Sequence, residues 1–160
     1  MPEEDFEEVQ LVVFMLGKEE FGVDITQVRE ILKIPRITSI PNSPEFIEGV
    51  INLRGQITTV MDLRKRLGVG GGEISENTRI VIVEVGDTTI GMVVDSVSEV
   101  LRLSTKDIDA APSIATDIEA EYIQGVGKLT DRLLILLDLG KILSRGEMEQ
   151  VKKLKVKSRR

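Results

Sequence analysis

The 160-residue sequence contains no cysteine, no histidine and no tryptophan. The absence of cysteine excludes disulfides, thiolate metal sites and a cysteine nucleophile. The absence of histidine removes the commonest general base and the commonest metal ligand in proteins. The carboxylates are scattered and do not follow the spacing of a calcium-binding loop. We therefore expect neither a metal site nor a bound cofactor.

Aromatic residues and long hydrophobic runs are also scarce. Four phenylalanines and one tyrosine are too few for the aromatic-lined groove that binds proline-rich peptides. The longest apolar runs, residues 11–16 and 133–137, are far too short to cross a bilayer. The N-terminal residues are acidic and polar, which argues against a secretory signal. These features predict a cytoplasmic protein that does not insert directly into a membrane.

Charge is distributed unevenly along the chain. The net charge is −6, although residues 151–160 alone carry six bases, so the rest of the chain is strongly acidic. An acidic surface repels phosphate backbones and argues against nucleic-acid binding. The basic tail by itself could bind RNA in a salt-dependent way, but a charged terminus is usually a solvated end.

What the sequence does contain is typical of β structure. In the stretch 49–68, GVINLRGQITTVMDLRKRLG, apolar residues alternate on both sides of Arg54-Gly55, which predicts two strands joined by a tight turn. Asp62 stands where a helix N-cap belongs, so a short helix is expected next. We favour a three-residue loop over 54–56, because its register places four apolar side chains on one face. These four are Ile51, Leu53, Ile57 and Met61.

The chain contains an internal repeat. Residues 11–34 align with residues 80–103 after a shift of 69, and residues 49–68 align with residues 125–144 after a shift of 76. Matched positions include Gly17 with Gly86, Gly22 with Gly91, Gly49 with Gly125, and Glu30 with Glu99. The two alignments indicate a tandem of two similar β-rich units.

The repeat predicts an all-β fold and its domain organisation. We expect an acidic tail over 1–8, one folded body over 9–150 and a basic tail over 151–160. Within the body, units at about 11–68 and 79–145 are joined by a linker over 69–78. Units of about 60 residues are marginal alone, so the two should pack together. Short strands with frequent turns suggest small barrels, because closure hides the edges of a sheet.

The repeat also creates a symmetric pair of carboxylates, Asp62 and Asp138. Two equivalent aspartates could form an acid dyad in an enzyme if both faced one cleft. Each is followed by a helix-like segment, so helix capping explains both with a single cause. We expect no enzymatic activity and keep the dyad as a remote alternative.

Four stretches, taken in order, carry a family resemblance: LVVFMLGKEEFGVDITQVREI, IPNSPEFIEGVINLRGQITTVMDLRKRLG, TTIGMVVDSVSEVL and GVGKLTDRLLILLDLGKIL. Together they closely resemble CheW, the family of bacterial chemotaxis coupling proteins, over about residues 9–145. The resemblance implies two SH3-like five-stranded β-barrels with short helices and a C-terminal helix. It also implies a non-enzymatic adaptor between the cytoplasmic tip of chemoreceptors (methyl-accepting chemotaxis proteins) and the regulatory domain of the histidine kinase CheA.

The resemblance also implies contact positions. A receptor-binding groove between the barrels would use Val12, Ile25, Val28, Glu30, Ile31, Val94 and Val100. Contact with the kinase would use Ile37, Arg54 and Ile57. A second, array-forming contact would use Ile114, where some relatives carry phenylalanine. The residues alone leave another interpretation open, in which the surplus aliphatic side chains are buried between the two units.

Two further alternatives stay open at this point. Arg54 is either a solvated turn residue or the partner of a carboxylate, within the protein or on another one. The family resemblance implies a cytoplasmic protein recruited to receptor arrays at the inner membrane. The alternative to the chemotaxis role is a related coupling role in a kinase pathway that does not control motility.

Overall fold

The computed structural model describes residues 7–69, 73–110 and 120–143. The strands are β1 (Glu8–Leu16), β2 (Glu19–Asp24), β3 (Val28–Lys33), β4 (Ile47–Leu53), β5 (Gln56–Asp62), β6 (Arg79–Val85), β7 (Thr88–Val94), β8 (Ser96–Ser104), β9 (Ile108–Asp109), β10 (Ile123–Lys128) and β11 (Leu133–Leu137). The short helices are η2 (Ile25–Gln27), α1 (Leu63–Leu67), η3 (Thr105–Asp107), η4 (Ala120–Tyr122) and α2 (Leu139–Ile142). In these described ranges, no helix is long and apolar enough to cross a membrane. Ile114 and the basic tail lie outside them.

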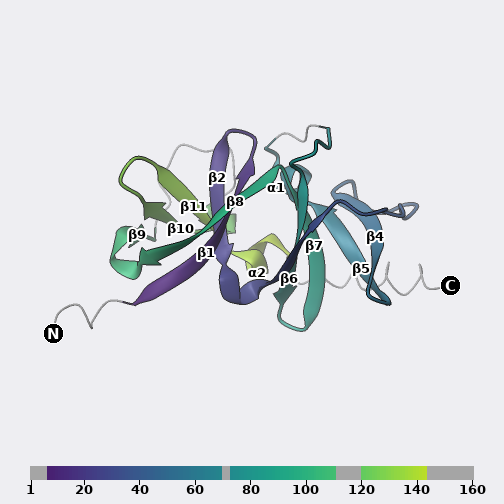
Figure 1. Cartoon of the computed structure of the whole chain (residues 1–160), viewed down its shortest axis with the longest axis horizontal. Helices are drawn as coiled ribbons and strands as arrows, with labels where there is room; N and C mark the ends of the chain where they lie inside the picture. Colours follow the sequence, from purple (N-terminus) through teal and green to yellow (C-terminus); the bar gives the residue numbers. More distant parts are fainter. Residues whose placement is uncertain (1–6, 70–72, 111–119, 144–160) are drawn as a thin grey trace.

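The strands form two mixed sheets that lie side by side (Figure 1). The six-stranded sheet has the order β8-β1-β2-β11-β10-β9, and the five-stranded sheet has the order β3-β6-β7-β5-β4. Neighbouring strands are antiparallel, except that β2 runs parallel to β11 and β5 runs parallel to β7. The predicted all-β fold with short helices is confirmed.

The two sheets do not correspond to the two sequential units of the repeat. Strands β1 and β2 belong to the six-stranded sheet with β8 to β11, whereas β3 to β5 belong to the five-stranded sheet with β6 and β7. The expected bounds 11–68 and 79–145 therefore describe the repeat and not the sheets. One continuous segment, 28–94, supplies the five-stranded sheet, and 8–24 together with 96–137 supplies the other.

Each unit has exchanged its first hairpin with the other. Under the two shifts, β1 corresponds to β6, β2 to β7, β3 to β8, β4 to β10 and β5 to β11. The orders β8-β1-β2-β11-β10 and β3-β6-β7-β5-β4 are then the same order. Because equivalent strands offer similar side chains to a neighbour, the repeat predicts the order of strands but not which copy supplies each one.

Three apolar cores hold the sheets together. One is built from the six-stranded sheet, by Leu11, Val13, Leu103, Leu134 and Leu136. A second is built from the five-stranded sheet, by Ile51, Val60, Ile80, Ile82 and Val93. The largest is shared by both sheets and both α-helices, and includes Val12, Phe14, Met92 and Leu139. Since successive strand residues face opposite ways, β1 contributes alternate residues to its own core and to the shared core.

The β4–β5 hairpin turns over two residues rather than three. Leu53 pairs with Gln56, and the turn residues Arg54 and Gly55 have φ values of 51° and 88°. Positive φ at both positions is typical of the type I′ turn, whose twist matches the flanking strands. Asn52 stabilises this turn, because its Oδ1 accepts a hydrogen bond of 2.8 Å from the Gly55 N–H. The three-residue register expected from the apolar pattern is wrong.

Both α-helices begin at the predicted aspartate caps. The Asp62 carboxylate accepts a hydrogen bond from the Arg64 N–H at 3.0 Å, and the Asp138 carboxylate accepts one from the Lys141 N–H at 3.2 Å. Helix α1 ends at Gly68, which adopts the left-handed conformation with φ of 72°. The capping interpretation of the two aspartates is confirmed.

The repeated glycines Gly49 and Gly125 lie where another backbone segment approaches closely. A Cβ at Gly49 would stand 2.1 Å from the Thr38 carbonyl oxygen, and one at Gly125 would stand 2.9 Å from that of Asp109. Thr38 forms an isolated antiparallel bridge with Val50, and residues 37–40 form no strand beyond this bridge. The glycines are repeated because both sheets accept an extra strand segment at the same place.

Candidate functional site

The residues expected to line a receptor-binding groove differ in burial. Val12 and Val94 are 2% and 0% exposed and belong to the core shared by the two sheets. Ile25 and Val28 are partly buried at the margin of the same core. The first pair therefore lies in the interface between the sheets, and its side chains are not at the surface of the free chain.

Ile31 and Val100 are the exposed members of the set. Their exposed fractions are 40% and 51%. They lie on β3 and β8, the edge strands of the two sheets, and the shift of 69 relates one to the other. Exposed edge strands usually carry charges that prevent further pairing, so large apolar side chains there point to contact with another molecule. The two edges thus present a repeat-related pair of apolar contacts.

An ion pair joins Glu30 on β3 to Arg54 in the β4–β5 turn. Two guanidinium nitrogens of Arg54 donate to the two carboxylate oxygens of Glu30, one of them at 3.1 Å. The hydrogen bond from Arg54 lowers the pKa of Glu30, and the same bond raises the pKa of Arg54. Because β3 and β4 are the two edges of the five-stranded sheet, the pair clasps these edges together.

The six-stranded sheet has a second clasp, which sequence reasoning missed. Arg132, just before β11, pairs with Glu99 on β8 at 3.1 Å and also with Glu20 on β2. Glu99 is the repeat partner of Glu30, but Arg132 is displaced by two positions from the alignment with Arg54. The alignment of Glu99 with Glu30 could have predicted this ion pair, because a carboxylate that is repeated on an edge strand is expected to pair with a cation in the facing turn.

The three residues expected to contact the kinase all belong to the five-stranded body. Arg54 has a side chain that is 71% exposed. Ile57 is half-buried on β5. Ile37 is half-buried against the core of the same sheet, which Leu53 also covers. The hairpin therefore brings Arg54 and Ile57 together, with Ile37 on the same sheet.

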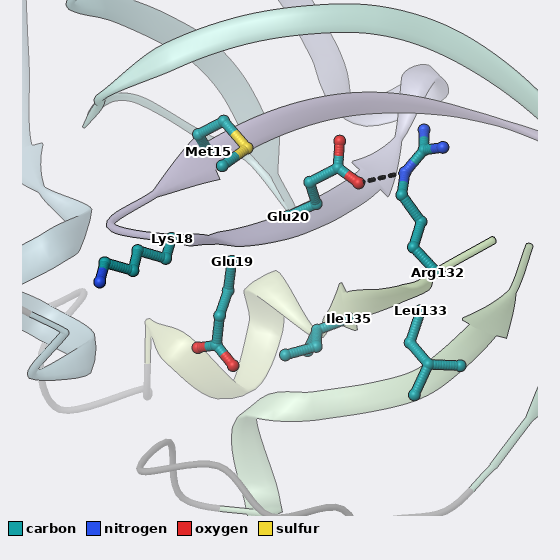
Figure 2. Close-up of a pocket in the computed structure, with 7 residues that line it drawn as sticks. All are labelled: Met15, Lys18, Glu19, Glu20, Arg132, Leu133 and Ile135. Atoms are coloured by element: carbon teal, nitrogen blue, oxygen red, sulfur yellow. Dashed lines mark hydrogen bonds and ion pairs between the residues drawn. The ribbon is translucent and has the colours of Figure 1, made fainter.

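Each clasp lies at the rim of a hollow. The first hollow, of about 690 Å³, is lined by Met15, Lys18, Glu19, Glu20, Arg132, Leu133 and Ile135. Figure 2 shows Glu20 and Arg132 pointing toward each other, with Leu133 and Ile135 contributing apolar walls. The second, of about 380 Å³, is lined by Arg29, Glu30, Leu53, Arg54, Gln56, Ile82 and Thr89. Both hollows combine apolar walls with charged rims.

A buried ionic network lies where α1 meets the six-stranded sheet. Arg64 is 3% exposed and donates to the Asp62 carboxylate from Nε at 3.0 Å and from Nη2 at 2.9 Å. Its Nη1 donates to Asp95 at 2.9 Å, and Asp95 also accepts a bond of 2.6 Å from the Gly17 N–H. The hydrogen bond to Asp62 raises the pKa of Arg64, so the guanidinium stays charged despite its burial.

Comparison with known proteins identifies the family. The CheW-like domain model matches residues 10–147. The chain is 43% identical over 142 residues to the chemotaxis protein CheW of Klebsiella aerogenes, covering 89% of this chain and 86% of that protein. The chain belongs to the CheW family. It is also 35% identical over 152 residues to CheW of Treponema pallidum, covering 92% of this chain and 89% of that protein.

A solved CheW structure agrees with the fold. The scaffolding protein TtCheW from Thermoanaerobacter tengcongensis superposes with a TM-score of 0.80 at 39% identity, covering 88% of this chain and 91% of that chain. The expected architecture of two SH3-like subdomains and the expected family are thereby confirmed. As a CheW-family member, the chain is an adaptor of chemotaxis signalling. The names of these relatives favour chemotaxis over a pathway unrelated to motility.

The two aspartates of the remote enzyme alternative have structural roles in this CheW fold. Asp62 is paired with Arg64, and Asp138 caps α2. In the part of the chain that the structure describes, no hydrogen bond or ion pair is found between these two carboxylates. Among the described residues, no cluster of three or more acidic side chains could hold a metal ion. Each carboxylate is thus engaged at the start of its own helix, and the dyad gains no support.

Proposed function

We propose that this CheW-family chain is a non-enzymatic adaptor that couples the cytoplasmic tip of chemoreceptors to the regulatory domain of the histidine kinase CheA. It acts in the cytoplasm and is recruited to receptor arrays at the inner membrane. The proposal rests chiefly on the exposed pair Ile31 and Val100, which occupy equivalent places on the edge strands β3 and β8.

The receptor surface consists of Ile31 and Val100 with Ile25 and Val28 at its base. Ile25 and Val28 are partly buried against the shared core, so they form a firm apolar floor. A helical partner docks by laying apolar side chains into such a surface at intervals of about three to four residues. Glu30 adds a charge to the same strand, with its side chain on the opposite face from Ile31, while Val12 and Val94 support the floor from beneath.

The kinase surface consists of Ile37, Arg54 and Ile57 on the five-stranded body. Two guanidinium nitrogens of Arg54 donate to Glu30, but the side chain is 71% exposed, so its remaining N–H groups can donate to a partner's carboxylate. The two half-buried isoleucines add apolar contact area. Ile114 is proposed as the second, array-forming contact. The two main surfaces share the Glu30–Arg54 ion pair as a boundary.

The receptor surface is tested by Ile31→Asp and Val100→Asp, measured in separate titrations with a receptor signalling fragment and with the CheA regulatory domain. Both side chains are exposed, so the variants should fold. We expect receptor binding to weaken by about tenfold or more, because a carboxylate buried in an apolar contact lacks a partner. Kinase binding should be unchanged.

Ile74→Asp is the matched control. Ile74 is an exposed apolar side chain, at 53%, but it lies on neither edge strand, so both affinities should stay at the wild-type value. Arg54→Ala should weaken kinase binding more than receptor binding. Failure of the folded wild-type protein to bind either partner would refute the proposed function. If Ile31→Asp and Val100→Asp weakened binding to the receptor fragment and to the kinase domain equally, the proposal of two separate binding surfaces would be contradicted.

A further inference from the structure

By the sheet assignments of the described strands, the chain crosses from one sheet to the other twice. The first crossing, residues 24–28, joins β2 to β3, and the second, residues 94–96, joins β7 to β8. The shift of 69 relates the two crossings. The edge strands that carry Ile31 and Val100 therefore each begin at a crossing, so the conformation of the crossings determines how these edges are placed.

The second crossing is bonded to parts of both sheets. The Asp95 backbone N–H donates to the Met15 carbonyl on β1 at 3.0 Å. Its carboxylate accepts from the Gly17 N–H in the β1–β2 turn at 2.6 Å and from Nη1 of Arg64 on α1 at 2.9 Å. Asp95 therefore ties the start of β8 to the six-stranded sheet on one side and to the helix of the five-stranded sheet on the other.

Arg64 is itself held rigidly. Arg64 and Asp62 are 3% and 1% exposed, and two further hydrogen bonds join Arg64 Nε and Nη2 to the Asp62 carboxylate. Charge-assisted bonds in a planar fork are directional, so the guanidinium cannot turn without breaking one of them. Figure 1 shows β8 starting beside α1 and running across to the six-stranded sheet.

The first crossing is built differently. Asp24 accepts hydrogen bonds from the Thr26 N–H at 2.9 Å and from the Thr26 hydroxyl at 2.8 Å, both within the crossing itself. The 3-10 turn η2 that forms this crossing contains no buried residue. One crossing is thus held by bonds to distant elements, while its repeat partner is held by a local cap.

We propose that Asp95 and Arg64 are positioning residues, which lock the β7–β8 crossing and so set the angle between the two sheets. That angle determines how far the β3 edge with Ile31 stands from the β8 edge with Val100. A partner that contacts both edges requires one particular separation. This second step rests on the proposed function, whereas the lock itself does not.

The lock is tested by measuring a distance between the sheets in the folded protein. Because the chain has no cysteine, the changes Gln56→Cys and Gln124→Cys place single spin labels at exposed positions on β5 and β10. Electron–electron double resonance should give one narrow distribution of distances between the two labels when the Asp95–Arg64 bond is intact. Asp95→Ala should lose that narrow distance. Asp95→Asn keeps an oxygen for Gly17 but loses the charge that pairs with Arg64, and should give an intermediate distribution.

Glu20→Gln is the control, because it breaks an ion pair within the six-stranded sheet without touching a crossing; its distance should match the wild type. A folded Asp95→Ala protein that keeps the narrow distance would overturn the lock. The same variant should bind the receptor fragment at least about fivefold more weakly, at the lower end of typical coupling between sites. A changed distance with unchanged receptor affinity would overturn the positioning role. If the wild type does not bind the receptor fragment, the proposed function fails. The distance between the spin labels in wild type and Asp95→Ala still tests whether Asp95 and Arg64 lock the crossing.

Discussion

Helices α1 and α2 occupy equivalent places in the repeat, and their N-termini are built in the same way. The Asp62 N–H donates to the Phe46 carbonyl at 2.7 Å, and the Asp138 N–H donates to the Tyr122 carbonyl at 2.9 Å. The shift of 76 that relates the two aspartates also relates the two aromatic residues. Features that a hairpin and its helix need locally are therefore kept in both copies.

The helices differ where the two sheets meet. Arg66 of α1 donates to the Ile142 carbonyl of α2 at 3.1 Å. Its guanidinium lies 5.3 Å from the ring centre of Phe46 and 5.0 Å from that of Tyr122. A single cation thus contacts both copies of the repeated aromatic residue. A second arginine at residue 142, the equivalent position in α2, would bring like charges together, so only one copy can keep it.

The largest difference between the helices should appear on removing Arg64, whose equivalent in α2 is Gly140. Arg64→Ala leaves the buried Asp62 carboxylate without its cation, so the free energy of unfolding should fall by about 3–5 kcal/mol. Lys141→Ala, on the exposed side of α2, should change it by less than about 0.5 kcal/mol. Urea denaturation measures both values. Similar small effects at the two positions would contradict the asymmetry.

The repeated glycines should show the next largest effects. Gly49→Ala places a Cβ 2.1 Å from the Thr38 carbonyl oxygen and strains a residue with φ of 148°, so we expect a loss of about 2–4 kcal/mol. Gly125→Ala meets Asp109 at 2.9 Å and should cost about half as much. Gly55→Ala serves as the control for positive φ alone, because nothing lies within 4 Å of its Cβ position. A loss at Gly55 as large as that at Gly49 would show that backbone strain, and not the approaching segment, requires glycine at 49. Gly125 does not have a positive φ, so a loss there reports the approach of Asp109 alone.

Features that depend on neighbouring residues could be predicted from the sequence. Strands β4 and β5 lie on the two sides of Arg54-Gly55, where the alternating pattern predicts two strands and a tight turn, and one residue type predicts both aspartate caps. Features that depend on distant residues could not. The Gly17–Asp95 bond spans 78 residues and the Arg64–Asp95 bond spans 31, and no local pattern marks either pair.

The candidate site shows the same division. The family resemblance supplied positions such as Val12 and Ile31 without their burial. Alternation on β1 places Val12 toward the shared core, while Ile31 on an edge strand stays exposed. The exchange of hairpins could not be predicted from the sequence either, because its pattern does not distinguish one copy of a repeated strand from the other as a pairing partner. The binding roles of these residues remain predictions.

A smaller effect, of opposite sign, is expected at Thr59 on β5. Its hydroxyl is buried without a hydrogen-bond partner among the described residues, and its repeat equivalent on β11 is Ile135. Thr59→Val keeps the shape and removes the unsatisfied group, so the free energy of unfolding should rise by about 1 kcal/mol. Thermal unfolding measures the change. Thr89→Val, at a partly exposed position on β7, is the control and should give little gain; a loss at Thr59 would mean that its hydroxyl has a partner after all.

The two clasps should give the smallest effects, and the effect of the Glu30–Arg54 clasp should depend on pH. Arg54 lowers the pKa of Glu30 below its usual value of 4.5, so the Glu30–Arg54 pair stabilises the fold at neutral pH. This contribution is lost as the pH falls through the lowered pKa, because the unfolded chain then binds no more protons than the folded one. The difference in urea midpoint between wild type and Arg54→Ala should therefore be small at about pH 7 and shrink as the pH falls through the lowered pKa of Glu30. Arg132→Ala should show a larger difference at neutral pH, because Arg132 pairs with three carboxylates, Glu20, Glu99 and Asp131. A difference for Arg54→Ala that stays constant across this pH range would mean that Arg54 acts through packing and not through its charge.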